Sequence, residues 1–314
     1  MSMKQQRPPV LAAWGAGVDS TAMLVELVSR GEPVDQVLFA DTGAEKPETY
    51  GFIPLFRRWL EGRGVASEVV RYRPTHFKNW PPYRTLTENL LTNGTLPSIA
   101  FGRGTCSLKW KVAPQHAWAK TWPPALAAWA RGEKVVKLIG FDCSRADDRR
   151  YAEAAKLDDP LYAHRYPLRE WGWTRADCAE RIARAGLPLP PKSACFFCPA
   201  SKIWELYWLA AHYPDLLERA LILERNALTG RHSRFSEVEF GATWEDLVRS
   251  ADRFPSSSTT VGLGRSFAWN QWARVNDVVD GSFRVRRNAE DRERFLALAD
   301  HLQSAGNALD ARAT

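Results

Sequence analysis

The sequence predicts an α/β fold with a doubly wound, mostly parallel sheet, followed by a mainly helical extension at the C-terminal end. Two observations lead to this prediction. Short apolar runs, typical of buried strands, alternate with stretches whose apolar residues recur every three or four positions, as in helices. In addition, a glycine-rich turn directly follows the first apolar run, where a strand meets a helix.

The first third of the chain gives the clearest elements. Gly31 stands where the first helix should end in a left-handed cap, and Asp41-Thr42-Gly43 stops the second apolar run. The polar triplet therefore belongs at the carboxyl end of a strand, where ligands bind in open α/β sheets. The predicted elements are strand 10–14, helix 18–30, strand 36–40, helix 47–63 and strand 67–72.

The apolar pattern of strands and helices is weaker from residue 73 to residue 105, where prolines and glycines interrupt it. A segment of that length without clear secondary structure more often has a function than serves only as a connection. Thr174 and Asp177 form a near capping box that starts a later helix. A change in composition near residue 227 separates a first domain, 1–226, from an extension, 227–314, with one helix at 289–305 and a disordered tail. The other predicted elements are helix 111–122, strand 134–141, strand 163–168, helix 174–185 and helices 203–211 and 216–226.

Composition narrows the class of protein. The chain has 314 residues, 45% hydrophobic and 25% charged, which is ordinary for a globular protein. It has no apolar run long enough to span a membrane, so we expect a cytoplasmic protein without membrane association. Its five cysteines fit metal or redox use in a reducing compartment better than a disulfide framework. The net charge of +7 would suit a polyanionic partner.

The loop Gly15-Ala16-Gly17-Val18-Asp19-Ser20-Thr21 has the chemistry of an anion site. Its small residues allow the backbone to approach a ligand, and two hydroxyls stand beside the free N–H groups of a first helical turn. A Walker loop would need a lysine before its Ser or Thr, and a dinucleotide loop would need a third glycine. Both are absent, so we expect a different nucleotide phosphate site. The alternative is a glycine-rich turn without a ligand.

The loop resembles the pyrophosphate-binding loop (PP-loop) of ATP pyrophosphatases, Ser-Gly-Gly-x-Asp-Ser, from which Gly15 and Ala16 depart. Asp-Thr-Gly at 41–43, with Pro-Glu-Thr at 47–49, resembles an element of the phosphoadenosine phosphosulfate (PAPS) reductase family within the adenine nucleotide alpha hydrolase-like fold. Further similar segments follow in the family's order, and together the motifs extend over residues 10–225. These segments are Cys106 to Pro114, Pro-Leu-Arg-Glu-Trp at 167–171, Gly-Leu-Pro at 186–188 and Cys-Phe-Phe-Cys-Pro at 195–199.

The resemblance implies an ATP site with Mg²⁺. Asp41 would bind Mg²⁺ or a ribose hydroxyl, although a turn-forming aspartate beside Gly43 explains it nearly as well. Lys109 and Lys111 would neutralise phosphate, or simply lie on a solvated helix face. The implied catalytic residues are Asp19, Asp41 and Lys111. The implied nucleotide-binding residues are Gly15, Ala16, Gly17, Val18, Asp19, Ser20, Thr21, Asp41, Thr42, Gly43, Gly140 and Arg150.

A possible metal site involves Cys195 and Cys198, which precede a helix predicted to begin at Pro199, where thiolates would be stabilised. With Cys106 they could hold a [4Fe–4S] cluster or zinc, and the resemblance favours the cluster. Cys143 is the candidate for a fourth ligand, whereas Cys178 has the spacing of a core residue. A redox dithiol or purely structural thiols remain alternatives.

These features predict an enzyme that splits ATP into AMP and pyrophosphate and adenylylates a substrate, for sulfur transfer to or modification of nucleic acid such as tRNA or DNA. Several of the 14 tryptophans stand beside basic residues, which suits stacked bases. One alternative is a sulfonucleotide reductase, although no cysteine follows Cys198 to act as its nucleophile. Another is a noncatalytic nucleotide- and nucleic-acid-binding subunit, working with partner proteins of a modification system. A homodimer is compatible with each.

Overall fold

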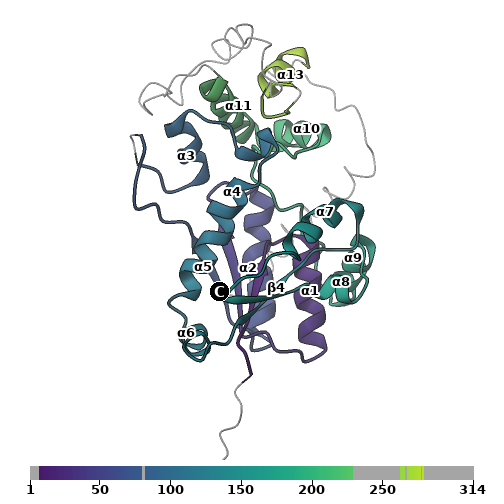
Figure 1. Ribbon diagram of the computed structural model, residues 1–314. Coiled ribbons are helices and arrows are strands. Elements are labelled where there is room, and N and C mark those ends of the chain that lie inside the picture. The colour runs from purple at the N-terminus through teal and green to yellow at the C-terminus, as the bar shows by residue number, and fades with distance from the viewer. Residues whose placement is uncertain (1–6, 80–81, 229–261, 266, 277, 279–314) are drawn as a thin grey trace, which may run out of the picture.

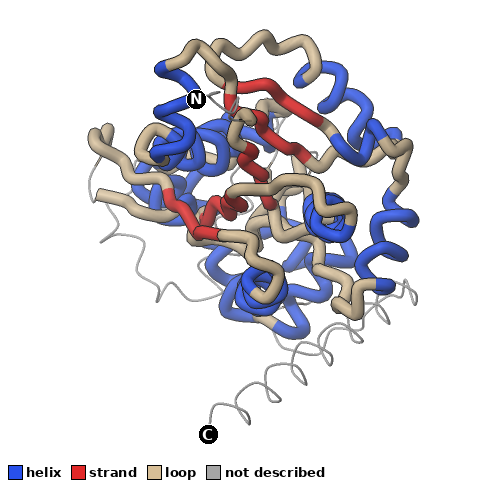
Figure 2. The backbone as a smooth tube through the Cα atoms, turned by 90° about the horizontal axis from the view of Figure 1, so that it is seen from below, coloured by secondary structure: helices blue, strands red, loops and turns tan. Residues whose placement is uncertain are grey.

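The computed structural model describes residues 7–79, 82–228, 262–265, 267–276 and 278. Five parallel strands form one twisted sheet in the order β3-β2-β1-β4-β5, with helices on both sides (Figure 2). The α/β class and the parallel sheet are therefore confirmed. The strand order reverses between β1 and β4, and ligands bind beyond the carboxyl ends of strands at such a point. The strands are β1 Val10–Trp14, β2 Gln36–Asp41, β3 Ser67–Arg71, β4 Val135–Ile139 and β5 Tyr162–Arg165.

Both faces of the sheet are covered, which explains why its strands read as continuous apolar runs. In β1, Val10, Ala12 and Trp14 face a core shared with α1, α2 and α9, whereas Leu11 faces the core under α5 and α6. Successive side chains of a strand point to opposite faces, so each run supplies both cores. The covering helices are α1 Val18–Ser29, α2 Pro47–Glu61, α9 Arg175–Arg184, α5 Ala113–Ala119 and α6 Pro123–Ala130.

A separate group of helices lies beyond the carboxyl ends of the strands, at the top of Figure 1. These helices share a third core, to which Trp110, Phe197 and Trp269 contribute fully buried rings. The buried carboxylate of Glu224 accepts hydrogen bonds from the backbone N–H groups of Leu263, Trp269 and Asn270, which fastens this piece of the extension to α11. The helices are α3 Leu86–Asn93, α10 Ile203–His212, α11 Pro214–Leu228 and α13 Trp269–Val275.

Several elements differ from the sequence prediction. Helix α3 lies in the segment without a clear pattern, where Thr85 and Glu88 form a capping box that starts it. Helix α6 was also missed. The predicted strand 163–168 ends at Arg165 because Pro167 begins the short helix α8, Pro167–Glu170. The interval between the predicted strands 134–141 and 163–168, to which no element was assigned, contains helix α7, Arg145–Ala154. The helix predicted at 289–305 and the tail lie outside the described residues.

The helix predicted at 111–122 begins earlier and is not uniform. It starts as α4, Thr105–Ser107, continues as the π-helical stretch η2, Leu108–Val112, and then becomes α5. Wide π turns are rare and are frequent at functional sites. In the described part of the chain, no helix has both the length and the apolar character needed to cross a membrane.

Candidate functional site

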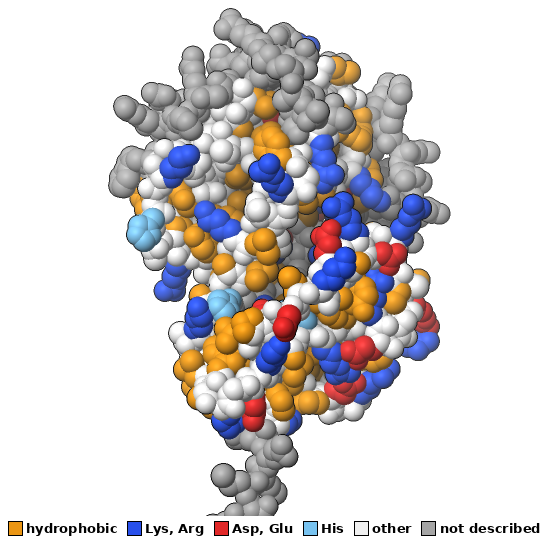
Figure 3. Space-filling model, viewed as in Figure 1, with side chains coloured by type: hydrophobic (Ala, Val, Ile, Leu, Met, Phe, Trp, Pro, Cys, Tyr) orange, Lys and Arg blue, Asp and Glu red, His pale blue; other side chains and the backbone are white. Residues whose placement is uncertain are grey.

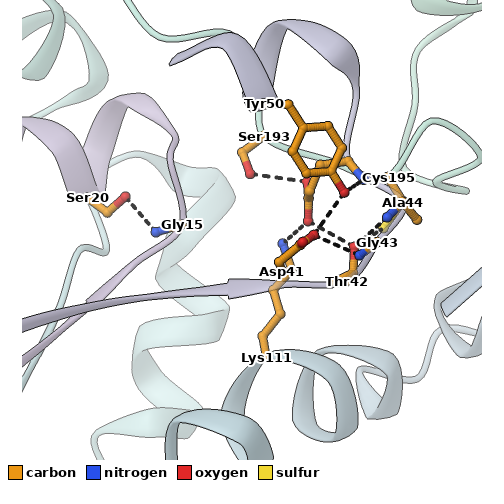
Figure 4. Close-up of polar contacts among 11 residues, drawn as sticks. Gly15, Ser20, Asp41, Thr42, Gly43, Ala44, Tyr50, Lys111, Ser193 and Cys195 are labelled. Atoms are coloured by element: carbon orange, nitrogen blue, oxygen red, sulfur yellow. Dashed lines mark hydrogen bonds and ion pairs between the residues drawn. The ribbon is translucent and has the colours of Figure 1, made fainter. Parts of the chain in front are cut away.

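The loop between β1 and α1 leaves backbone donors free. Ser20 Oγ accepts a hydrogen bond from Gly15 N at 3.1 Å (Figure 4). Thr21 Oγ1 accepts one from the Trp14 indole at 3.0 Å. Both hydroxyls therefore stabilise the conformation of the loop through hydrogen bonds within the protein. Gly17 is the N-cap and has no side chain to cap the helix, so the N–H groups of Val18, Asp19 and Ser20 have no acceptor among the described residues. These donors suit an anion.

Ala16 and Gly140 give the loop its shape. Ala16 has a φ of 55°, in the left-handed region that favours glycine. Gly140 directly follows β4, and a Cβ atom there would stand 2.9 Å from Ser20 Cα and 3.0 Å from Ser20 N. The end of β4 therefore touches the first turn of α1, and any side chain at position 140 would push into it.

Asp19 has one partner and one free oxygen. Its Oδ2 accepts a hydrogen bond from Arg175 at 2.6 Å, whereas Oδ1 is buried without a hydrogen bond. Burial, opposed by Arg175 and reinforced by the Asp142 and Asp147 carboxylates, raises the pKa of Asp19 to about 6. The Asp19, Asp142 and Asp147 carboxylates therefore act on one another beside the β1–α1 loop, although no three His, Cys, Asp or Glu side chains of the described residues form a ready metal-binding group. Carboxylate oxygens are the ligands that Mg²⁺ prefers.

Arg150, a predicted nucleotide ligand, lies beside this acidic group. Its guanidinium forms an ion pair with Asp147 at 2.7 Å and lies over the Phe141 ring. Arg150 lies in α7, so it approaches the site from the first turns of this helix. Its side chain is mostly exposed, and its charge offsets part of the negative charge of the three carboxylates.

Asp41 lies at the carboxyl end of β2, as predicted, but both of its oxygens are engaged. Oδ1 accepts hydrogen bonds from Gly43 N and from the Tyr50 hydroxyl, each at 2.8 Å (Figure 4). Oδ2 accepts one from Arg71 at 2.8 Å. Burial, with the nearby Asp41 carboxylate, raises the pKa of Tyr50, which keeps that hydroxyl a donor. In this arrangement Asp41 organises the turn, the alternative that the sequence left open.

Gly43 explains why the turn needs a glycine. Its φ is 69°, and a Cβ there would come within 2.4 Å of Thr85 Cγ2. The backbone N–H of Leu86 also donates to the carbonyl of Thr42 at 2.9 Å. The start of α3 is therefore packed against the turn that follows β2, which brings residues 71–112 to the candidate site.

Glu45 is the centre of a buried polar group that the sequence did not reveal. Lys111 forms an ion pair with its Oε1 at 3.0 Å, Thr42 donates to the same oxygen at 3.3 Å, and Ser193 donates to Oε2 at 3.5 Å. Burial acts to lower the pKa of Lys111, but the Glu45 carboxylate outweighs it and raises that pKa. Lys111, predicted to meet phosphate, is thus held as a cation beside a protein carboxylate.

The cysteine loop is joined directly to this group. Phe196 N donates to the carbonyl of Ala44 at 3.0 Å, and Cys195 Sγ is 3.6 Å from the Thr42 hydroxyl. Figure 4 shows Ser193, Tyr50 and Cys195 around the Asp41 turn, with Lys111 approaching from the opposite side. The predicted strand-end motif and the predicted Cys-x-x-Cys motif, more than 140 residues apart, therefore form one site.

A buried charge network supports the cysteine loop. The Glu205 carboxylate binds Lys46 and Lys192, each at 2.6 Å, and Lys192 also donates to the carbonyl of Ala200. Glu205 and Lys46 are both almost completely buried. Because such a pair is costly to break from one side, the network holds residues 192–200 against the loop after β2.

Two of the predicted metal ligands, Cys195 and Cys198, share one turn, in which Cys198 N donates to the carbonyl of Cys195 at 3.0 Å. Cys106 is near enough to Cys198 to affect its pKa. Burial raises the pKa of Cys195, and Lys111 opposes this rise. Burial also raises the pKa of Cys198; the Cys106 thiol adds to that rise, whereas Lys192 and Lys46 oppose it. These lysines would balance the charge of thiolates that bind a metal. Within the described ranges, no three His, Cys, Asp or Glu side chains form a ready metal-binding group.

Cys143 was predicted as a fourth ligand and Pro199 as the first residue of a helix. The Cys143 Sγ donates to the carbonyl of Leu168 and its N–H donates to that of Trp173. The prediction that a helix begins at Pro199 was wrong, because α10 begins at Ile203. The thiols are therefore balanced by lysine side chains rather than by a helix N-terminus. Cys178 is fully buried in the core, as predicted.

Sequence reasoning missed Glu45, Ser193, Arg175 and Asp142 as members of the site. Glu45 lies within a recognised motif and Asp142 directly follows a predicted strand, so the positions of these two residues in the sequence could have identified them as members of the site. No signal in the sequence connects Arg175 with Asp19. No family model matches the chain, and a comparison with curated proteins found no significant match.

Proposed function

We propose that this protein binds ATP at the β1–α1 loop, splits it into AMP and pyrophosphate and adenylylates a substrate, as PP-loop enzymes related to the PAPS reductase family do. One observation carries the proposal. The three free N–H groups at the start of α1 lie between β1 and β4, where the strand order reverses, with a partnerless carboxylate oxygen of Asp19 beside them.

The chemistry divides among the residues at this edge of the sheet. The N–H groups of residues 18–20 bind phosphate oxygens, and Asp19, whose Oδ1 has no hydrogen-bond partner among the described residues, is the favoured place for the Mg²⁺ that accompanies ATP. A substrate oxygen attacks the α-phosphorus, the bond to the bridging oxygen breaks, and pyrophosphate leaves. Asp41 then acts through the turn it holds rather than as a ligand, which revises its implied role.

The cysteine site is part of the same proposal. Cys106, Cys195 and Cys198 are the residues that would hold a [4Fe–4S] cluster, or zinc as the alternative, and three lysines supply the positive charge that thiolate ligands need. A bound cluster would supply electrons for chemistry on sulfur. The basic character of the chain and its exposed aromatic residues favour nucleic acid as the substrate to be modified.

A second candidate function has its own support. Lys111 and Asp41, both implied catalytic residues, are engaged by protein partners, Glu45 in one case and Arg71 with Tyr50 in the other. This arrangement suits a noncatalytic subunit that binds ATP and nucleic acid within a modification system. Such a subunit would bind ATP without releasing pyrophosphate, even with nucleic acid present.

The test is a substitution that fills the anion site without harming the fold. Gly17 has an extended φ of −105° and space for a Cβ, and aspartate is a favourable N-cap. Gly17→Asp should therefore keep or slightly raise the melting temperature, while its carboxylate occupies the free N–H groups and repels phosphate. We expect ATP affinity, measured by titration calorimetry with Mg²⁺, to fall at least 100-fold.

The control carries the same added charge elsewhere. Gly51 is exposed on α2 with nothing near it, so Gly51→Asp should bind ATP as the native protein does. Pyrophosphate release with ATP, Mg²⁺ and tRNA or single-stranded DNA then separates the two candidate functions. Equal ATP affinity in Gly17→Asp and the native protein would refute the proposed site.

A further inference from the structure

Residues 71–112, between β3 and α5, hold nearly all of the excess positive charge. The segment contains seven Lys and Arg residues and one acidic residue, Glu88, which gives a net charge of +6, whereas the whole chain has +7. Glu88 is already used, because its carboxylate accepts the N–H groups of Arg84 and Thr85 in the capping box of α3. The rest of the chain is almost neutral.

Two of these seven cations are paired, Arg71 with Asp41 and Lys111 with Glu45, and the other five form no ion pair with any other residue that the structure describes. These five are Arg73, Lys78, Arg84, Arg103 and Lys109. The region around α7 to α9 differs, since Arg150, Arg165, Arg169, Arg175 and Arg181 each bind a carboxylate. Figure 3 shows the same contrast, with Lys and Arg among hydrophobic side chains above and acidic side chains gathered at the lower right.

Aromatic rings stand among these cations. Phe77 and Phe101 expose 42% and 54% of their surface, and the Phe77 ring meets the edge of Tyr83, with 5.0 Å between ring centres. The Lys109 ammonium lies within 6 Å of the ring centres of Tyr72, Tyr83 and Trp110. Exposed planar rings between unpaired cations are the combination that binds unpaired bases and their phosphates.

This surface borders the candidate site. The backbone N–H of Cys106 donates to Ser98 Oγ at 2.8 Å, in the short helix η1, Ser98–Phe101, that carries Phe101. Arg103 lies between η1 and Cys106 in the chain, and Leu86 N is bonded to the carbonyl of Thr42. A strand of nucleic acid on the surface would therefore lead directly to the cysteine site and the turn after β2.

We propose that the surface formed by Arg73, Phe77, Arg84, Phe101, Arg103 and Lys109 binds single-stranded nucleic acid, the cations meeting phosphates and the two phenylalanines stacking on unpaired bases. An acidic protein would use the cations but would not need the exposed rings. The inference deepens the proposed function and rests on it for the reaction that follows binding, because it names the form in which the substrate arrives.

The test measures binding alone, with the full chain and no ATP. Fluorescein-labelled 20-nucleotide single strands of DNA and RNA, and the matching duplex, are titrated by anisotropy across a salt series. We expect single strands to bind more tightly than the duplex. Phe101→Ala and Phe77→Ala should each weaken binding about tenfold, the effect of losing one stacked base. Arg84→Gln with Arg103→Gln should lower the salt slope by about 1.4.

Matched controls keep the outcome clear. Leu126 on α6 is exposed to 47% and Arg131 follows that helix, so Leu126→Ala and Arg131→Gln should bind as the native protein does. Gly17→Asp should bind the single strand normally, which separates failure of this inference from failure of the ATP site. The proposal would be overturned if the duplex bound more tightly than single strands, or if both phenylalanine variants kept the native affinity for single strands. It would also be overturned if those variants lost affinity for polyglutamate to the same extent as for single strands.

Discussion

The β1–α1 loop and the cysteine site are built in opposite ways. The loop is made by neighbours in the chain, and its chemistry comes from backbone N–H groups and from two positions, Gly17 and Gly140, where a side chain is absent. The cysteine site joins distant segments through buried side-chain charges, such as Glu45 with Lys111 and Lys46 with Glu205. Substitutions should therefore harm the loop through added atoms, and the cysteine site through lost charges.

The largest effect concerns bound metal. After anaerobic purification, the native protein should carry iron with a broad visible absorption band, and Cys106→Ala, Cys195→Ala or Cys198→Ala should remove it completely, because each deletes a ligand. Metal analysis with the visible spectrum measures this. Cys143→Ala tests whether Cys143 is the fourth ligand. If this variant retains its iron, Cys143 is not a ligand and only forms its contact with Leu168. Full metal content in all three ligand variants would contradict a site at these cysteines.

Glu205→Gln should give the next largest effect. The change removes the anion between Lys46 and Lys192 and leaves Lys46 charged and buried, which costs about 3 kcal/mol in the free energy of unfolding. Urea denaturation checks the value. Glu180→Gln breaks an exposed pair with Arg184 and should cost less than about 0.5 kcal/mol. Similar costs for both variants would mean that the buried network does not support the cysteine loop.

Gly140→Ala tests close approach at the loop. A methyl group 2.9 Å from Ser20 Cα would meet backbone rather than a flexible side chain, so α1 must shift. We expect a loss of about 2 kcal/mol in stability and a matching loss of ATP affinity. Gly51→Ala, in a helix with nothing near the new methyl, should be stabilising by up to about 1 kcal/mol. A stable Gly140→Ala variant with native ATP affinity would argue against this contact.

Asp19→Asn should stabilise the fold while weakening Mg²⁺-dependent ATP binding. The folded protein raises the pKa of Asp19 from 3.8 to about 6, so it retains a proton that the unfolded chain has released. Stability therefore falls as pH rises through this window, and the loss is complete above pH 6. Asparagine cannot ionise, so the variant should match the native protein near pH 4 and exceed it by about 2 kcal/mol at pH 7.

Thermal or urea unfolding measured across pH 4 to 8 checks the Asp19 prediction, and ATP titration with and without Mg²⁺ checks the binding. Asp177→Asn is the comparison, because Asp177 is exposed and its pKa is lowered by its bonds to Thr174. That variant should lose stability above pH 4 rather than gain it. A native-like pH profile in Asp19→Asn would mean that burial does not affect this carboxylate.

The sequence alone determined the order of the strands along the chain, the glycine-rich turn between the first strand and the first helix, the helix start at Thr174 and the burial of Cys178. Apolar periodicity, turn residues and caps act over a few residues, so they can be recognised without knowing the fold. The α3 capping box was equally local and was missed because prolines and glycines around it obscured the periodicity.

The tertiary structure decided which side chains meet. Asp41 is engaged by Arg71 and Tyr50, and Lys111 faces Glu45, because the sheet and the helices above it bring these segments together. The same holds for the raised pKa of Asp19, which depends on burial. Ion pairs and desolvation depend on distance in space and on exclusion of water, and neither quantity exists before the chain has folded.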